Sequence, residues 1–259
     1  MKNVALITGA SSGIGKELAF IHAQLKGDLV IVARRQNELE ALKTELESKF
    51  GVQVKTIIKD LTKKDAPKEI YTELKQENIE IEYLINNAGF GGIGKFHERD
   101  WVIDEAMINL NIMSLTALTR LFLTDFVKRN SGRILNVAST AAFVPGPLQA
   151  VYYATKSYVL SFSNAIAEEL HDTNVTVTAL CPGPTDSEFA KVSGMDKTSL
   201  FKKSFSAKMV ANAGYNAMMK GKLVKISGIG FSQRLMMALV PFSPIKLVLK
   251  QVRMMQEVK

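Results

Sequence analysis

The chain has 259 residues, 47% of them hydrophobic and 22% charged, which suits one large globular domain with a buried core. Cys181 is the only cysteine, so an intramolecular disulfide is excluded and a reducing compartment is expected. The formal charge of +8 raises the question of a polyanionic partner. The basic residues form no cluster with aromatic residues, however, which argues against nucleic-acid binding.

The sequence predicts no targeting or membrane-spanning segment. The apolar run at the N-terminus is only about five residues long, too short for a signal peptide or a span. We expect no apolar stretch of roughly 18 residues elsewhere. A cytoplasmic protein is therefore expected.

Short runs rich in β-branched residues alternate with longer segments of helical periodicity. Strands are predicted at Val4–Thr8, Leu29–Val32, Val52–Ile58, Tyr83–Ile85, Arg133–Val137, Val175–Leu180 and Leu223–Ile226. Helices are predicted at residues 13–26, 36–49, 63–77, 101–128, 151–171 and 206–220. The strands are mostly apolar throughout, as in parallel strands covered on both faces. The pattern predicts an α/β fold: a single-domain, doubly wound parallel sheet (Rossmann fold) of about seven strands, spanning residues 1–259.

Two segments depart from this alternation. Residues 183–215 are predicted to form a substrate lid within the domain, and residues 229–259 a C-terminal tail. The lid sequence is apolar between its lysines, which favours a hydrophobic substrate. Its apolar residues are Phe189, Met195, Leu200, Phe201, Phe205 and Met209. An alternative is that these side chains only pack the loop onto the domain.

A glycine-rich turn follows the first predicted strand and leads into a helix. Glycines let a backbone approach a pyrophosphate closely, and a helix N-terminus offers free N–H groups and a positive dipole end. The spacing is G-x-x-x-G-x-G rather than the general dinucleotide-binding spacing. The turn predicts a dinucleotide site formed by Gly9, Ser11, Ser12, Gly13, Ile14 and Gly15.

The residues after the second predicted strand bear on the choice between NAD and NADP. Ala33 stands where an acid would bind a 2′-hydroxyl, and Arg34 and Arg35 follow at once. Guanidinium groups suit a 2′-phosphate, so the predicted cofactor is NADP(H). Asp60 and Leu61 follow the third predicted strand and are expected to flank an adenine. Asn87, Ala88 and Gly89 follow the fourth, at the carboxyl edge where such sheets bind ligands.

Tyr152 and Lys156 are four residues apart in a segment of helical periodicity, so they share one face. A nearby ammonium and an oxidised nicotinamide would lower the pKa of a tyrosine toward neutrality. Tyr153 is the competing candidate, although a serine stands four residues after it. The pair predicts a catalytic acid/base, Tyr152, tuned by Lys156.

Two further polar residues support this interpretation. Ser139 ends the fifth predicted strand, where its hydroxyl is placed to donate to a substrate carbonyl oxygen. Asn111 lies inside an apolar helical stretch, a mildly unfavourable position that a role in a proton relay would explain. Asn109 is its alternative.

In this order, TGASSGIG, NNAG, an Asn, a Ser and YxxxK resemble the short-chain dehydrogenase/reductase superfamily, over roughly residues 1–187. Within it, the chain is most similar to NADP-dependent bacterial reductases. The resemblance implies that Lys156 also binds the nicotinamide ribose and that Asn111 positions Lys156 through a water. It places Arg34 at the 2′-phosphate and Asn87 near the ribose. It also implies a homodimer or homotetramer.

The same resemblance implies that the loop after the sixth strand meets the nicotinamide carboxamide through Thr185 and Ser187, with Pro182 and Gly183 fixing its course. Cys181 precedes this loop, and we interpret it as a small buried hydrophobe. The three histidines, His22, His97 and His171, lack metal-ligand spacing, so no metal site is predicted.

The tail has apolar residues at helical spacing, from Ile245 to Met255, and a separate basic face of Lys246, Lys250 and Arg253. Packing on the protein's own surface or on a second subunit is one interpretation, and contact with a membrane surface is the other.

Taken together, the sequence predicts an NADP-dependent oxidoreductase acting on a small-molecule carbonyl or secondary alcohol, and the apolar lid sequence favours a hydrophobic one. The alternative is a catalytically silent NADP-binding regulator of the same fold.

Overall fold

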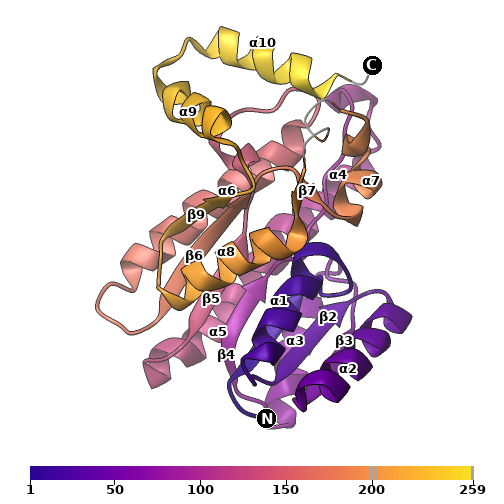
Figure 1. Ribbon diagram of the computed structural model, residues 1–259, viewed down its shortest axis with the longest axis vertical. Helices are drawn as coiled ribbons and strands as arrows, with labels where there is room; N and C mark the ends of the chain where they lie inside the picture. The colour runs from indigo at the N-terminus through magenta and orange to yellow at the C-terminus, as the bar shows by residue number, and fades with distance from the viewer. Residues whose placement is uncertain (199–200, 202–203, 258–259) are drawn as a thin grey trace.

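The computed structural model describes residues 1–198, 201 and 204–257. Its main sheet has seven parallel strands in the order β3-β2-β1-β4-β5-β6-β9 (Figure 1). The strand order runs outward from the centre in both directions, which makes the sheet doubly wound and leaves a crevice where the order reverses. The predicted fold class is confirmed.

The predicted strands and helices occur, with ends displaced by a few residues. The strands of the sheet are β1 (Val4–Thr8), β2 (Leu29–Ala33), β3 (Val54–Ile58), β4 (Ile81–Asn86), β5 (Arg133–Val137), β6 (Thr176–Pro182) and β9 (Val224–Ser227). The helices that alternate with them are α1 (Gly13–Gln24), α2 (Gln36–Phe50), α3 (Ala66–Gln76), α4 (Trp101–Ile108), α5 (Leu115–Arg129), α6 (Ala150–Glu169) and α8 (Ala207–Met219). A separate ribbon pairs β7 (Thr185–Asp186) with β8 (Phe205–Ser206).

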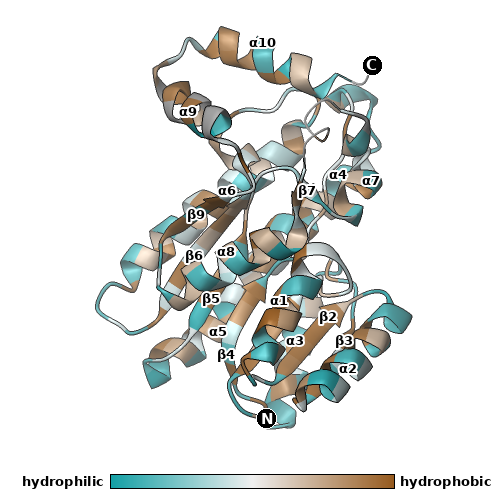
Figure 2. Cartoon of the chain, viewed as in Figure 1, coloured by the Kyte–Doolittle hydropathy of each residue, from teal (hydrophilic) through white to brown (hydrophobic). Residues whose placement is uncertain are grey.

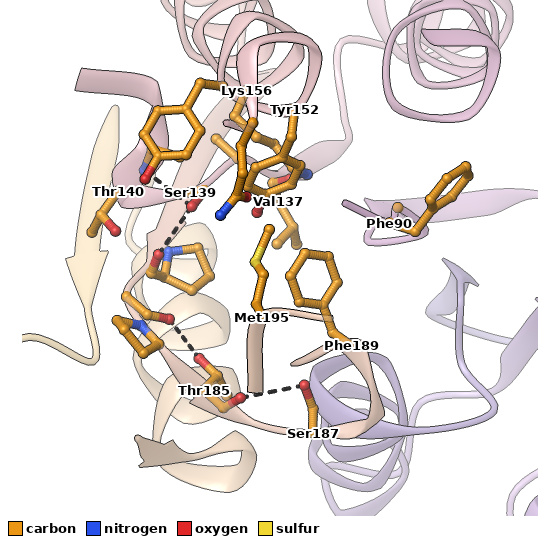
Figure 3. Close-up of a pocket in the computed structure, with 18 of the residues that line it drawn as sticks. Phe90, Val137, Ser139, Thr140, Tyr152, Lys156, Thr185, Ser187, Phe189 and Met195 are labelled. Atoms are coloured by element: carbon orange, nitrogen blue, oxygen red, sulfur yellow. Dashed lines mark hydrogen bonds between the residues drawn. The ribbon is translucent and has the colours of Figure 1, made fainter. Parts of the chain in front are cut away.

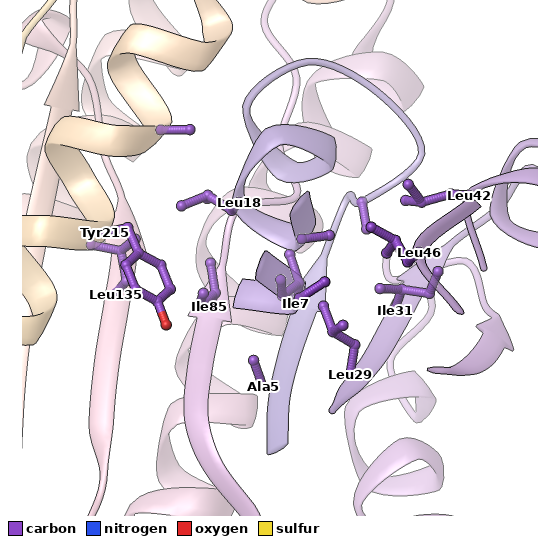
Figure 4. Close-up of a cluster of buried hydrophobic side chains, with 14 of the residues drawn as sticks. Ala5, Ile7, Leu18, Leu29, Ile31, Leu42, Leu46, Ile85, Leu135 and Tyr215 are labelled. Atoms are coloured by element: carbon purple, nitrogen blue, oxygen red, sulfur yellow. The ribbon is translucent and has the colours of Figure 1, made fainter. Parts of the chain in front are cut away.

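Side chains of the central strand point alternately to two apolar layers. Ala5 and Ile7 pack into the layer that holds α1, α2 and α8, which Figure 4 shows in close-up. Val4 and Leu6 pack into the layer under α3, α5 and α6. Successive residues of a strand face opposite sides, so this strand is apolar from Val4 to Ile7, and all five of its residues, including Thr8 at its end, are buried.

The predicted helix over residues 101–128 is not one regular α-helix, because a π-helical segment, Asn109–Ser114, joins α4 to α5. The continuous run Trp101–Arg129 is long and apolar enough to cross a membrane by length and composition. The expectation that no such stretch occurs was therefore wrong. The polar residues in the middle of the run are mostly Asn, Ser and Thr, which carry no charge and leave its mean hydropathy high. In the structure, Leu118, Phe122 and Phe126 of this run are buried against the sheet.

The predicted lid is shorter than expected. It was assigned to residues 183–215, but residues from Ala207 onward belong to α8, whose Val210 and Tyr215 are buried in the core. The segment predicted to be the lid comprises, before α8, the strand β7, α7 (Glu188–Ser193), a short 3₁₀ turn at Met195–Lys197, and β8. Leu200 lies outside the described residues.

The C-terminal tail folds into two helices, α9 (Phe231–Leu239) and α10 (Ile245–Gln256). Figure 1 shows them projecting from the sheet domain, with α10 reaching back above α4 and α7. Val248 and Val252 are buried in a cluster with Tyr152 and Met195, so the inner face of α10 packs on its own chain. The helical periodicity predicted for this segment is confirmed.

His22 of α1 is buried, and its two ring nitrogens contact the carbonyl oxygen of Asn3 at 2.7 Å and the Tyr215 hydroxyl at 2.8 Å. Because a carbonyl only accepts, Nε2 carries the proton and Nδ1 accepts from the tyrosine. Burial lowers the pKa of His22 below 6.5, although hydrogen bonds to Asn3 and Asp28 oppose the change.

We expect this histidine to make the fold sensitive to acid. Below about pH 6.5 the unfolded chain binds a proton at His22 that the folded chain does not, so stability falls as the pH drops. The loss approaches about 1.4 kcal/mol per pH unit for this one group. Chemical denaturation between pH 7 and 5 measures it, with His22→Gln as the non-titrating comparison. An equal acid-side slope in both proteins contradicts the assignment.

Candidate active site

The glycine turn between β1 and α1 has the backbone that its sequence requires. Gly9 and Gly13 have φ values of +67° and +54°, a region that favours glycine. A Cβ on Gly15 would lie 2.3 Å from the carbonyl oxygen of Gly9, so no side chain fits there. Ser12 caps α1 without a side-chain hydrogen bond. The first N–H groups of the helix thus have no partner within the helix and can bind an anion.

Asn87 ties the end of β4 to this turn. Its Nδ2 donates to the carbonyl oxygens of Thr8 at 3.0 Å and Gly9 at 3.1 Å. In return, Oγ1 of Thr8 accepts from the backbone N–H groups of Asn87 and Ala88, each at 3.0 Å. Asn87 therefore shapes the turn, a contact that the sequence did not reveal.

Arg34 and Arg35 follow β2 with different partners. Arg35 donates to Oγ of Ser11 at 3.0 Å and forms an ion pair with Glu188 at 2.8 Å. Arg34 lies close enough to Asp60 to affect its ionisation. Burial opposes that ionisation, but hydrogen bonds from Thr62 and the charge of Arg34 together lower the pKa of Asp60.

Ser139, Tyr152 and Lys156 meet at the carboxyl edge of β5, as predicted from their positions (Figure 3). The hydroxyl of Ser139 accepts from the backbone N–H of Ala141 at 3.1 Å and interacts with that of Tyr152. Nζ of Lys156 donates to the carbonyl oxygen of Val137 at 2.9 Å and lies 5.9 Å from the centre of the Tyr152 ring. Both Tyr152 and Lys156 are buried.

Burial controls the ionisation of this pair in the chain itself. It raises the pKa of Tyr152 to about 12, and the hydrogen bond with Ser139 acts in the opposite direction. Burial also lowers the pKa of Lys156 to about 8. The expectation that Lys156 and an oxidised nicotinamide together lower the pKa of Tyr152 toward neutrality concerns the protein with its cofactor, and it stays a prediction. With its pKa above neutrality, the Tyr152 hydroxyl keeps its proton in the protein alone.

Tyr153, the competing candidate, also lines the cavity, but its hydroxyl has another partner. Its hydroxyl accepts from Nε2 of Gln256 at 2.6 Å, and both side chains are buried. This contact attaches the C-terminal end of α10 to α6. Tyr153 is therefore occupied by a structural hydrogen bond, and Tyr152 is left beside Ser139.

Asn111 lies in the π-helical segment and is fully enclosed. Its Oδ1 accepts from the N–H of Phe90 at 3.2 Å, while Nδ2 donates to the Phe90 carbonyl at 3.0 Å and to Oγ1 of Thr155 at 3.1 Å. A Cβ on Gly89 would lie 2.9 Å from Oδ1 of Asn111 and 3.4 Å from Nζ of Lys156. Asn111 and Lys156 thus flank the same glycine without a direct hydrogen bond between them.

The structure brings most of the predicted residues to one cavity of about 1100 Å³. Gly15 and Asn111 do not line it; the former packs behind the turn and the latter behind Gly89. The predicted residues on its wall are Gly9, Ser11, Ser12, Gly13, Ile14, Arg34, Arg35, Asp60, Leu61, Asn87, Ala88, Gly89, Ser139, Tyr152, Lys156, Pro182, Gly183, Thr185 and Ser187.

The loop after β6 crosses the cavity close to the glycine turn. Oγ1 of Thr185 donates to the carbonyl oxygen of Gly183 at 2.9 Å, and a Cβ on Gly13 would lie 3.0 Å from Cβ of Ser187. Cys181, which precedes this loop, is buried, and burial raises its pKa to about 12. Its interpretation as a buried hydrophobe agrees with this geometry.

Sequence reasoning missed two residues of the site, Glu188 on the cavity wall and Gly91 behind it. Glu188, the first residue of α7, reaches from the lid to Arg35, and hydrogen bonds with Arg35 and Ser12 lower its pKa. Gly91 packs beneath Tyr152, and a Cβ there would lie 2.8 Å from Met195 and 3.2 Å from the tyrosine ring. The glycines after NNAG in the sequence were the available signal for Gly91. No sequence pattern pointed to Glu188.

The described residues contain no group of three or more His, Cys, Asp or Glu side chains that could hold a metal ion.

Comparison with known proteins agrees with this geometry. Residues 3–198 match the sequence model of the family described as short chain dehydrogenase. The chain belongs to the short-chain dehydrogenase family. The predicted resemblance to this superfamily of oxidoreductases is thereby confirmed.

Individual relatives span most of the chain. The NADP-dependent 3-hydroxy acid dehydrogenase of Schizosaccharomyces pombe is 39% identical, over 72% of this chain and 73% of its own. Human very-long-chain 3-oxoacyl-CoA reductase is 30% identical, over 85% of this chain and 71% of its own. Among solved structures, a short-chain dehydrogenase from Sphingobium yanoikuyae in complex with NADPH has a TM-score of 0.83 and 32% identity, with 92% of each chain covered.

Proposed function

We propose that the protein is an NADPH-dependent reductase of apolar ketones, which also oxidises the matching secondary alcohols. One observation carries the proposal. Ser139, Tyr152 and Lys156 line the same cavity as the glycine turn and Arg34, which unites a proton donor with a binding site for a phosphorylated dinucleotide. The alternative, a silent NADP-binding regulator, gives no reason for these polar groups to converge.

The residues present fit NADP(H), which relatives of this chain carry in their names or crystal structures. The glycine turn and the N-terminus of α1 would hold the pyrophosphate, and Arg34 with Arg35 the 2′-phosphate. Asp60 and Leu61 would flank the adenine, and Thr185 and Ser187 would meet the carboxamide. When bound, the reduced cofactor supplies a hydride from C4 of its nicotinamide.

The side chains of the protein then supply the proton. Ser139 donates a hydrogen bond to the substrate carbonyl oxygen, and the neutral hydroxyl of Tyr152 gives its proton to that oxygen as negative charge develops. The ammonium of Lys156 stabilises the resulting phenolate and holds the nicotinamide ribose. Asn111 supports this site from behind, as a positioning residue for Phe90 and Gly89.

The substrate end of the cavity favours an apolar molecule. It is lined by the lid and by the inner faces of α9 and α10, and the only charged residue among the described ones there is Glu188, which is paired with Arg35. A carboxylate would be buried there without a partner, at a high cost in free energy. A long or bulky neutral ketone therefore fits better than a small hydroxy acid. Its described apolar residues are Phe189, Met195, Phe201, Leu239, Val240, Val248, Val252 and Met255.

A series of unbranched methyl ketones tests this proposal. With each added methylene, kcat/KM is expected to rise by about fourfold until the chain fills the cavity. Loss of NADPH absorbance measures the rate, and 3-oxo acids of equal length provide the charged comparison. Val252→Phe should shift the optimum to shorter ketones. Faster turnover of the acids than of the neutral ketones would contradict the proposed substrate class.

We further propose that the protein works in the cytoplasm as a homodimer or homotetramer. The run Trp101–Arg129 supports self-association, because it exposes Trp101, Val102, Ile103 and Met113 on the outside of the fold.

A further inference from the structure

The positive charge of the protein is concentrated near its C-terminus. Residues 197–256 contain eleven lysines and arginines and no aspartate or glutamate. Since the net charge of the whole chain is +8, the remainder is slightly acidic. A segment of this length without an acid generates a field that attracts anionic partners.

Residues 231–256, here termed the C-terminal arm, end this segment. The arm consists of α9, a 3₁₀ turn at Val240–Phe242 and α10, and it stands away from the sheet domain (Figure 1). Its inner face lines the apolar end of the cavity. The arm is therefore both a wall of the substrate cavity and an outer surface of the molecule.

The outer side of the arm carries apolar and basic side chains together. Phe242 is 86% exposed at the tip of the turn, and Leu247 is 64% exposed in the first turn of α10, at the rim of the cavity. Figure 2 shows hydrophobic and hydrophilic residues alternating along α10. Lys246 and Lys250 are exposed beside them, and neither forms an ion pair within the described part of the chain. Exposed apolar residues flanked by lysines are typical of helices that lie in a membrane interface.

The charge distinguishes between the possible partners of this surface. Two copies of the arm would repel each other, because their exposed charges have the same sign. A nucleic acid would satisfy the lysines but leave Phe242 and Leu247 in water. An anionic lipid bilayer satisfies both, since its headgroups attract the lysines and its acyl region accepts the apolar side chains.

We propose that the C-terminal arm docks the protein on anionic lipid bilayers. Phe242 and Leu247 insert at the interface, and Lys246 and Lys250 contact the headgroups. The arm that borders the apolar cavity then lies against the bilayer. If the proposed function holds, an apolar ketone dissolved in the membrane reaches Tyr152 along a short route through the arm.

Co-sedimentation of the full-length protein with lipid vesicles tests the docking. Partition onto phosphatidylcholine vesicles with about 30% phosphatidylglycerol should exceed partition onto pure phosphatidylcholine by at least about tenfold at low salt. High salt should remove most of the difference, because it screens exposed charges. Equal partition onto both kinds of vesicle, or no binding to either, would overturn the proposal.

Matched variants locate the surface. Lys246→Gln with Lys250→Gln, and separately Phe242→Ser, should each reduce binding several-fold. The controls are Lys64→Gln with Lys68→Gln, an exposed pair of equal spacing on another surface, and Leu25→Ser, an exposed residue at the end of α1. An equal loss in the controls would refute a role of the arm.

Two further measurements separate the outcomes. Turnover of a water-soluble ketone without vesicles should remain at the wild-type level in all these variants, so a failure of docking leaves the proposed function standing. Light scattering on a sizing column reports whether Phe242→Ser dissociates an oligomer. If Phe242→Ser dissociates a dimer and the wild-type protein does not bind vesicles, a second copy rather than a bilayer covers the arm.

Discussion

Replacing Tyr152 by phenylalanine is expected to lower kcat for ketone reduction by about 10²- to 10⁴-fold, the usual contribution of a positioned proton donor. The ring remains, so its contacts with Phe189 and Tyr153 persist. Only the hydroxyl beside Ser139 is lost. The dissociation constant for NADPH, measured by fluorescence titration, should stay close to the wild-type value.

The adjacent tyrosine provides the matched control for this substitution. Tyr153→Phe also removes one buried hydroxyl from α6, but that hydroxyl serves Gln256. This substitution should lower the free energy of unfolding and leave kcat nearly unchanged. Loss of turnover in Tyr153→Phe, or near-normal turnover in Tyr152→Phe, would show that the assignment of proton transfer to Tyr152 is wrong.

The second large effect is expected at Arg34. Removing its guanidinium in Arg34→Ala should weaken NADPH binding by about 10- to 150-fold, the value of one charge-assisted contact to a phosphate. Binding of NADH, which lacks the 2′-phosphate, should hardly change. The ratio of kcat/KM for the two cofactors measures the preference.

Arg35 makes an informative comparison because Ser11 and Glu188 already hold it. Glu188→Gln should release Arg35 and strengthen NADPH binding modestly, since the carboxylate competes with the phosphate for the same guanidinium. Adding Ala33→Asp to Arg34→Ala should turn the preference toward NADH. Equal losses for NADPH and NADH in Arg34→Ala would mean that the arginine supports the fold rather than the phosphate.

The parts of the fold that depend on local periodicity could be predicted from sequence. Strand β1 is apolar from Val4 to Ile7 because both of its faces are covered, and that pattern is visible without coordinates. The π-helical segment could not be predicted in this way. Its extra residue per turn positions Asn111 against the backbone of Phe90, a contact between segments about twenty residues apart, and periodicity carries no information about such contacts.

The candidate site, too, could be predicted only in part from the sequence. Tyr152 and Lys156 share a helix face, so their spacing alone relates them, and Ser139 follows from its place at a strand end. The pKa of Tyr152 does not follow from spacing, because it depends on how completely the lid and α10 enclose the ring. The role of the tail was also hidden, since only tertiary contacts such as Gln256 with Tyr153 show that α10 belongs to the cavity.

The most direct test of the account is the transfer of deuterium to an apolar ketone from NADPH that carries deuterium at both C4 positions of the nicotinamide. Mass spectrometry of the alcohol product should find one deuterium on the carbinol carbon with the wild-type protein. With Tyr152→Phe, far less product should form under the same conditions, although the cofactor still binds. Unlabelled alcohol from the wild-type protein, or equal labelled product from both proteins, would contradict hydride transfer coupled to a proton from Tyr152.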